Sequence, residues 1–133
     1  MADHPNVRLA EEAWNAVSRS DVKALRSLWS EDLVWHVQGD SPWTGDHIGA
    51  EAIIDYLAQV GEASENYSIE LDDILANDNY VVVLSQVKTK IGDHQLDTPY
   101  VLIGRIEDSR IVEVWTLPME PDVANAFWKS VRV

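Results

Sequence analysis

The chain has 133 residues, which is enough for one domain with a single hydrophobic core, and no Pro-, Gly- or Ser-rich linker divides it. Its net charge of −13 argues against nucleic acid and anionic membranes as partners, because phosphate groups need Lys and Arg to neutralise them. The lack of cysteine excludes disulfides and thiol chemistry. We expect one cytoplasmic domain over residues 1–133, with no signal peptide and no apolar run long enough to span a membrane.

Helical periodicity marks the first part of the chain. Pro5 suits the first turn of a helix, and apolar residues recur at helical spacing from Val7 to Val17. Asp21 is the expected cap of a second helix, whose apolar stripe extends to Trp29. The sequence therefore predicts two successive amphipathic helices.

A short strand, a loop and a third helix follow. LVWHVQ (33–38) predicts the strand, and GDSPWTGDHIG (39–49) predicts the loop because of its glycines and proline. The third helix should run from Ala52 to Val60 and end at Gly61.

From Tyr67 onward the hydrophobic period changes to two. Strands are expected over 67–75, 80–91, 94–106 and 110–117, and a last helix over 122–131. Helices with one strand among them, followed by consecutive strands, predict an α+β fold. The long strands carry apolar residues on both faces, so we expect helices to cover one face and a second copy of the chain to cover the other. The expected assembly is a homodimer that packs through the sheet.

The order of these elements resembles the nuclear-transport-factor-2-like superfamily, also called ketosteroid isomerase-like, and most closely its SnoaL-like branch. AWNAVSRSDVKALRSLWSEDLVWHV, SPWTGDHIGAEAIIDYL and RIVEVWTLP carry the resemblance, which covers nearly the whole chain. It implies a curved antiparallel sheet wrapped as a cone around the N-terminal helices, a cystatin-like α+β barrel with a pocket at its wide end. Relatives include isomerases, polyketide cyclases, epoxide hydrolases, dehydratases and non-enzymatic binding domains, so the fold alone does not settle the function.

His36 occupies the position that the resemblance assigns to the catalytic aspartate of ketosteroid isomerases. Its ordinary pKa of about 6.5 suits a general base or acid near neutral pH. The alternative is a core or rim histidine that is satisfied by a backbone carbonyl. The isomerases' oxyanion hole does not carry over, because Ala13 and Trp14 lie near its tyrosine position and Val101 and Leu102 near its aspartate position.

Two aspartates are weaker catalytic candidates. Asp40 follows the first strand, where loop carboxylates more often cap turns. Asp97 lies close to Pro99, and a β-bulge at that proline would turn the carboxylate toward the cavity.

Aromatic residues and one glutamate are expected to line the pocket, although ordinary core packing is the alternative for the aromatic ones. The expected lining residues are Trp14, Trp43, Tyr56, Tyr100, Glu113 and Trp115.

The sequence thus predicts a small-molecule enzyme that uses acid–base chemistry without cofactor or metal. Its substrate would be an apolar, cyclic or polyketide-like compound, and the reaction an isomerisation, cyclisation, hydration or dehydration. The alternatives are a non-catalytic small-molecule-binding domain and a dimeric scaffold with the same fold.

Overall fold

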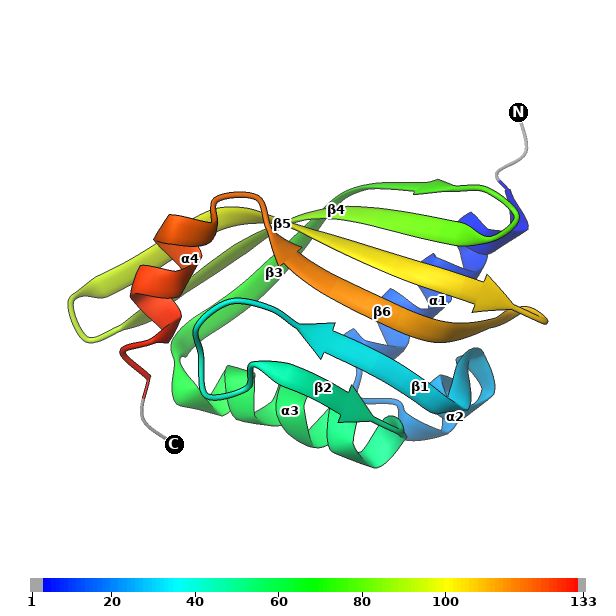
Figure 1. Cartoon of the computed structure of the whole chain (residues 1–133), viewed down its shortest axis with the longest axis horizontal. Coiled ribbons are helices and arrows are strands. Elements are labelled where there is room, and N and C mark those ends of the chain that lie inside the picture. The colour runs from blue at the N-terminus through cyan, green and yellow to red at the C-terminus, as the bar shows by residue number, and fades with distance from the viewer. Residues whose placement is uncertain (1–3, 132–133) are drawn as a thin grey trace.

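A computed structural model of the chain describes residues 4–131 and shows four helices beside one sheet (Figure 1). The elements in chain order are α1 (Pro5–Ser18), α2 (Val22–Leu28), β1 (Trp29–Val37), β2 (Gly45–Ile48), α3 (Ala50–Ala63), β3 (Glu65–Ala76), β4 (Tyr80–Ile91), β5 (His94–Glu107), β6 (Arg110–Pro118) and α4 (Pro121–Trp128). None of the helices in this part of the chain has the length and apolar character needed to cross a membrane.

The six strands form one sheet in the order β2-β1-β6-β5-β4-β3. Neighbouring strands are antiparallel except β1 and β6, which run parallel. The expected α+β class is confirmed, and the parallel pair makes the sheet mixed rather than wholly antiparallel. In Figure 1 the sheet lies in front of α1, while α3 runs along β2 and α4 lies at the opposite end from α2.

The core lies between the sheet and the helices. Leu25 on α2, Leu33 on β1 and Ile53 on α3 are at most 2% exposed, so three elements meet in one packed centre. A second cluster, which includes Phe127 and Trp128, fixes α4 against β4 and β5. The face of the sheet that packs on α1 is called the inner face below, and the opposite one the outer face.

The helix starts follow from local hydrogen bonding. Asp21 caps α2 as expected, because its Oδ1 accepts the backbone N–H of Ala24 at 3.1 Å. His4 caps α1 in the same way, with Nδ1 accepting the N–H of Asn6 at 3.1 Å. These side chains bind donors that have no partner within the helix.

Several boundaries differ from the sequence prediction, and the last helix ends at Trp128 rather than at residue 131. β2 lies inside the expected loop, where residues 45–48 pair with β1. β1 begins at Trp29 rather than at Leu33. α3 continues through Gly61 to Ala63, since one glycine costs a helix only about 1 kcal/mol.

The β-bulge expected at Pro99 is absent, and that prediction is wrong. The pairing Gln86↔Pro99 continues without a register shift. The Pro99 carbonyl accepts the N–H of Met119 at 3.0 Å, so the backbone of Pro99 faces the β6 side, where strand pairing begins only at Tyr100. The missing N–H therefore removes no bond from the ladder.

Candidate functional site

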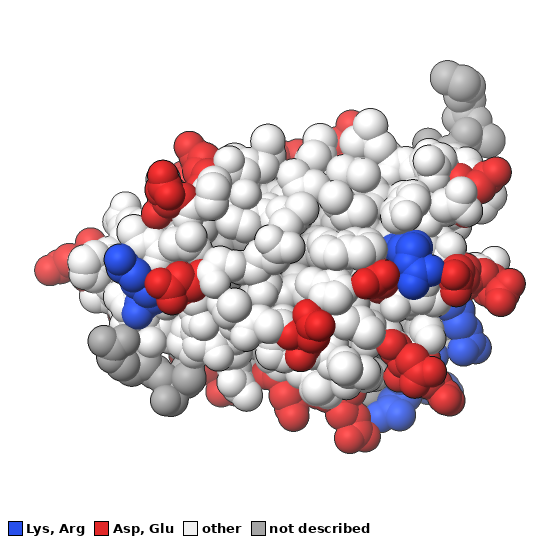
Figure 2. All heavy atoms as spheres, viewed as in Figure 1, with Lys and Arg blue, Asp and Glu red and all other residues white. Residues whose placement is uncertain are grey.

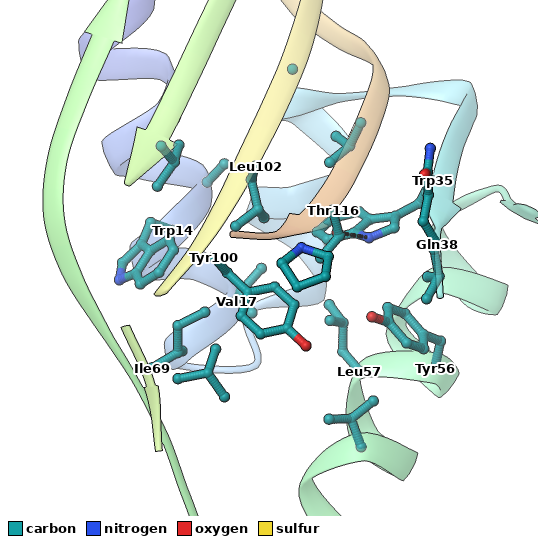
Figure 3. Close-up of a pocket in the computed structure, with 18 of the residues that line it drawn as sticks. Trp14, Val17, Trp35, Gln38, Tyr56, Leu57, Ile69, Tyr100, Leu102 and Thr116 are labelled. Atoms are coloured by element: carbon teal, nitrogen blue, oxygen red, sulfur yellow. Dashed lines mark hydrogen bonds between the residues drawn. The ribbon is translucent and has the colours of Figure 1, made fainter. Parts of the chain in front are cut away.

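A cavity of about 240 Å³ lies between the inner face of the sheet and the helices α1, α3 and α4 (Figure 3). Its wall is mainly apolar, with valine and leucine side chains between seven aromatic rings. The aromatic lining residues are Trp14, Trp29, Trp35, Tyr56, Tyr67, Tyr100 and Trp128. Such a wall favours flat, apolar ligands.

Two indole N–H groups at this wall donate to hydroxyl groups that also line the cavity. Trp35 Nε1 donates to Thr116 Oγ1 at 2.7 Å, and Trp128 Nε1 donates to the Tyr100 hydroxyl at 2.8 Å. These bonds satisfy the indoles and fix the orientation of the rings.

The phenols of the cavity stay protonated at neutral pH. Burial raises the pKa of Tyr67 to about 12. Burial also raises the pKa of Tyr56, and the nearby Tyr67 and Tyr100 add to this effect. For Tyr100, burial raises the pKa while the hydrogen bond from Trp128 opposes the increase.

Asp40 is the only Asp, Glu, His, Lys or Arg among the described residues that line the cavity. It is exposed and lies in the loop between β1 and β2, so its carboxylate marks the rim. Its backbone N–H donates to Asn125 Oδ1 at 2.9 Å, which ties this loop to α4. Gln38 and Ser41 line the same region. The polar rim contrasts with the apolar interior.

Trp14, Tyr56 and Tyr100 line the cavity, but the expectation for Trp43 needs correction. Trp43 is 6% exposed and packs edge-on against Tyr56 and Trp128, at 6.4 and 5.8 Å between ring centroids. Its Nε1 donates to Gln59 Oε1 at 3.0 Å. Trp43 therefore does not line the cavity itself. It is buried against Tyr56 and Trp128, which do line it.

The expectation that His36 faces the cavity is also corrected. Its neighbours Trp35 and Val37 line the cavity, and side chains alternate along a strand, so the His36 ring lies on the outer face. Glu113 and Trp115 lie on that face too, because they alternate with Val114 and Thr116, which line the cavity from β6. The prediction that His36, Glu113 and Trp115 line the cavity is therefore wrong, and the positions that alternate with them line it instead.

On the outer face His36 bridges two carboxylates. Its Nδ1 lies 2.6 Å from Asp46 Oδ1 and its Nε2 lies 2.6 Å from Glu113 Oε2, while the ring stacks on Trp115. Arg105 Nε donates to the other oxygen of Glu113 at 3.1 Å. We call Asp46, His36, Glu113 and Arg105 the outer polar network. It joins β2, β1, β6 and β5 in that order.

The outer polar network shifts the acidity of its members. The hydrogen bond to Glu113 raises the pKa of His36, and Asp46 adds to the increase, while partial burial opposes it. The hydrogen bond from His36 lowers the pKa of Glu113, and Arg105 lowers it further. The network therefore favours an imidazolium between two carboxylates.

Asp97 does not turn toward the cavity either, since the bulge on which that expectation depended is absent. Its Oδ1 accepts a hydrogen bond from Gln86 Nε2 at 2.6 Å, and the side chain is exposed. Of the three catalytic candidates, only Asp40 lies at the cavity.

Sequence reasoning missed several lining residues. Tyr67 and Ile69 alternate at the start of β3, a signal that was present in the sequence. Thr116 alternates with Val114 on β6 in the same way, whereas Asn125 gave no such signal, because only tertiary contacts bring it to the wall. Within residues 4–131, no group of three or more His, Asp or Glu side chains is arranged to hold a metal ion.

The α+β fold is the cystatin-like fold, which solved structures described as cystatin-like and as nuclear-transport-factor-2-like share. The chain belongs to the SnoaL-like domain family, whose model matches residues 10–114. The predicted resemblance is thereby confirmed. None of the curated proteins matches the sequence significantly.

Several solved structures share the fold over most of their length. A protein of unknown function with a cystatin-like fold from Xanthomonas campestris is 27% identical, with a TM-score of 0.79 and coverage of 92% of this chain and 96% of that one. Bal32a, from a soil-derived mobile gene cassette, is 23% identical, with a TM-score of 0.83 and coverage of 93% and 96%. IdmH from Streptomyces antibioticus, named as a candidate polyketide cyclase, is 17% identical, with a TM-score of 0.70 and coverage of 91% and 96%.

Proposed function

We propose that the protein binds a largely apolar, ring-containing small molecule in the cavity. The observation that carries this proposal is the wall itself, in which seven aromatic rings and many aliphatic side chains enclose about 240 Å³. An engineered apolar cavity of about 150 Å³ already binds benzene, so this one has room for more than one ring. Burial of the ligand's apolar surface supplies the affinity.

Two matched variants test this proposal. Trp14→Gln removes an aromatic ring from the cavity wall, whereas Trp115→Gln makes the same change on the outer face. We expect the neutral fluorescent probe N-phenyl-1-naphthylamine to bind the wild type and Trp115→Gln alike, and Trp14→Gln about tenfold more weakly, as one lost aromatic contact implies. Equal affinity of all three proteins would contradict the proposal.

A second candidate function is catalysis by cofactor-independent acid–base chemistry of the isomerase, cyclase, hydratase or dehydratase type. One observation favours it: Asp40, the only carboxylate among the described lining residues, lies at a polar rim where a bound molecule would meet it. The naming of IdmH as a candidate polyketide cyclase on the same fold supports this type of chemistry. Asp40 would take a proton from the bound compound and return it at another atom.

Replacement of Asp40 by Asn separates binding from catalysis. The amide keeps the size of the side chain but cannot accept a proton as a base. With a substrate in hand, we expect kcat to fall by about 100- to 10,000-fold with little change in ligand affinity. Unchanged turnover would remove Asp40 from the chemistry and leave binding as the function.

We also propose a homodimer that packs through the outer face. Half-buried apolar side chains cover its centre: Val82, Leu84, Val101, Ile103, Trp115 and Leu117. Figure 2 shows a broad area without Asp, Glu, Lys or Arg on this face, although the chain carries a net charge of −13. An apolar area of this kind supports association with a second copy.

A further inference from the structure

Tyr100 presents a hydroxyl whose proton is free for a ligand. The side chain lines the cavity and is 8% exposed. Its oxygen accepts the N–H of Trp128 at 2.8 Å, so the indole occupies one lone pair. A phenol that accepts one bond still has its own O–H to donate. The indole nitrogen has no acceptor to offer, and none of the described residues accepts this proton, so it is available to a molecule in the cavity that Tyr100 lines.

Tyr56 presents a second such hydroxyl from α3. Within residues 4–131, no hydrogen-bond partner accompanies it, and no fully buried side-chain oxygen in that range lacks a partner. The hydroxyl is therefore open to the cavity that the residue lines. Figure 3 shows the hydroxyl oxygens of Tyr56 and Tyr100 turned toward the same space between α3 and β5. Burial raises the pKa of both phenols, so both remain donors at neutral pH.

The charges around the cavity restrict which chemical group of a ligand can accept hydrogen bonds from these two hydroxyls. No Lys, Arg or His is among the described lining residues, and the single charged one is the acidic Asp40. A ligand carboxylate or phosphate would lose its hydration without gaining an opposite charge. A neutral oxygen acceptor meets no such penalty.

We propose that the hydroxyls of Tyr100 and Tyr56 donate hydrogen bonds to the carbonyl oxygen of an uncharged ring ketone. This assignment rests on the small-molecule binding proposed above and narrows its substrate class. The apolar wall holds the rings, and the two phenols select the oxygen and fix its direction. A ketone bound in this way gains two donors that its hydrocarbon counterpart cannot use.

The test compares three bicyclic probes of nearly equal size: 1-tetralone, tetralin and 1,2,3,4-tetrahydro-1-naphthoate. Their affinities are measured by NMR titration for the wild type, Tyr100→Phe, Tyr56→Phe and the control Tyr80→Phe. Tyr80 is 43% exposed and does not line the cavity, so its hydroxyl cannot reach the ligand. The ratio of tetralone to tetralin affinity cancels any general weakening of the apolar site.

We expect each cavity variant to lower that ratio by about two- to tenfold, as the loss of one hydrogen bond implies. Tyr80→Phe should leave it unchanged, and the carboxylate should bind most weakly. Tyr100→Phe also leaves the Trp128 N–H without its acceptor. If that variant fails to fold, Tyr56→Phe decides, because the Tyr56 hydroxyl has no partner to lose among the described residues.

A ratio unchanged in the folded cavity variants would overturn this inference and leave the proposed function intact. Tighter binding of the carboxylate than of the ketone would also overturn it. If neither tetralin nor tetralone bound, the proposed function itself would fail, and this inference with it.

Discussion

Trp35 and His36 are neighbours in the sequence, yet their side chains lie on opposite faces of β1. The tryptophan lines the cavity, and the histidine joins the outer polar network. Two-residue periodicity separates the two sets correctly but does not state which set faces inward. Both sets are rich in apolar residues here, because both faces of the sheet are apolar. The choice of His36 as a cavity residue therefore had no support from periodicity.

Stability should depend on pH through the outer polar network. The pKa of His36 is raised above 6.5, so its contribution is complete below about pH 6.5 and is lost as the pH rises through the folded-state pKa. The pKa of Glu113 is lowered below 4.5, so its contribution is present above that value and is lost as the pH falls through the folded-state pKa. The network should stabilise the fold most between about pH 4.5 and 6.5.

Urea unfolding of the wild type and His36→Gln across pH 4–9 measures this dependence. Their difference in free energy of unfolding should be greatest in the stated window and decline toward both ends. Ligand affinity should be the same in both proteins, because the ring lies outside the cavity. A difference that is constant over the whole range would show that the network does not titrate as inferred.

At the scale of elements, the loop between β1 and β2 shows what sequence patterns miss. Residues 45–48 pair with β1 although GDHI contains no apolar alternation, since backbone bonding alone is enough to form a short edge strand. The burial of Trp43 could not be predicted from the sequence either, because it depends on contacts with Tyr56 and Trp128 from distant elements. The helices and the long strands, in contrast, were predicted to within a few residues, because their hydrophobic periodicity extends over many positions.

The contact between this loop and α4 should be sensitive to a single methyl group. Gly39 has φ of +100°, and a Cβ there would lie 2.4 Å from Asn125 Oδ1, the acceptor of the Asp40 N–H. We expect Gly39→Ala to lower the free energy of unfolding by roughly 2–4 kcal/mol, from backbone strain and the lost hydrogen bond.

Gly61→Ala is the matched control. Gly61 lies in α3, and a Cβ there meets nothing within 4 Å. This variant should be more stable than the wild type by about 0.5–1 kcal/mol, because alanine favours helix. Denaturant unfolding measures the stability of both variants. If Gly39→Ala were as stable as the wild type, the proposed sensitivity of the contact between this loop and α4 would be wrong.

At the scale of the whole molecule, the sheet separates two apolar surfaces with different roles. The inner one encloses the cavity, and the outer one, where Ile103 lies beside Trp115, is proposed to meet a second copy. The sequence predicted that both faces are apolar, but it could not reveal that Asp40 is the one charged side chain among the described residues that line the cavity. That property follows from which side chains the curved sheet brings together.

Light scattering at micromolar concentration tests the assembly. We expect the wild type to be a dimer and Ile103→Lys to be a monomer, because a lysine at the centre of the outer face would be buried without a partner. Val123→Lys, which places the same charge on an exposed position of α4, should remain a dimer. A monomeric wild type would contradict the proposed dimer and leave the apolar outer face unexplained.

The location of a bound ring compound tests the central claim most directly. In a methyl-labelled sample titrated with 1-tetralone, methyl resonances of Val83 and Leu102 on the inner face should shift, and those of Leu84 and Ile103 on the outer face should not. These residues alternate along β4 and β5, so each inner methyl group has an outer control beside it. Shifts confined to Leu84 and Ile103, or no shifts at saturating tetralone, would contradict a ligand-binding cavity.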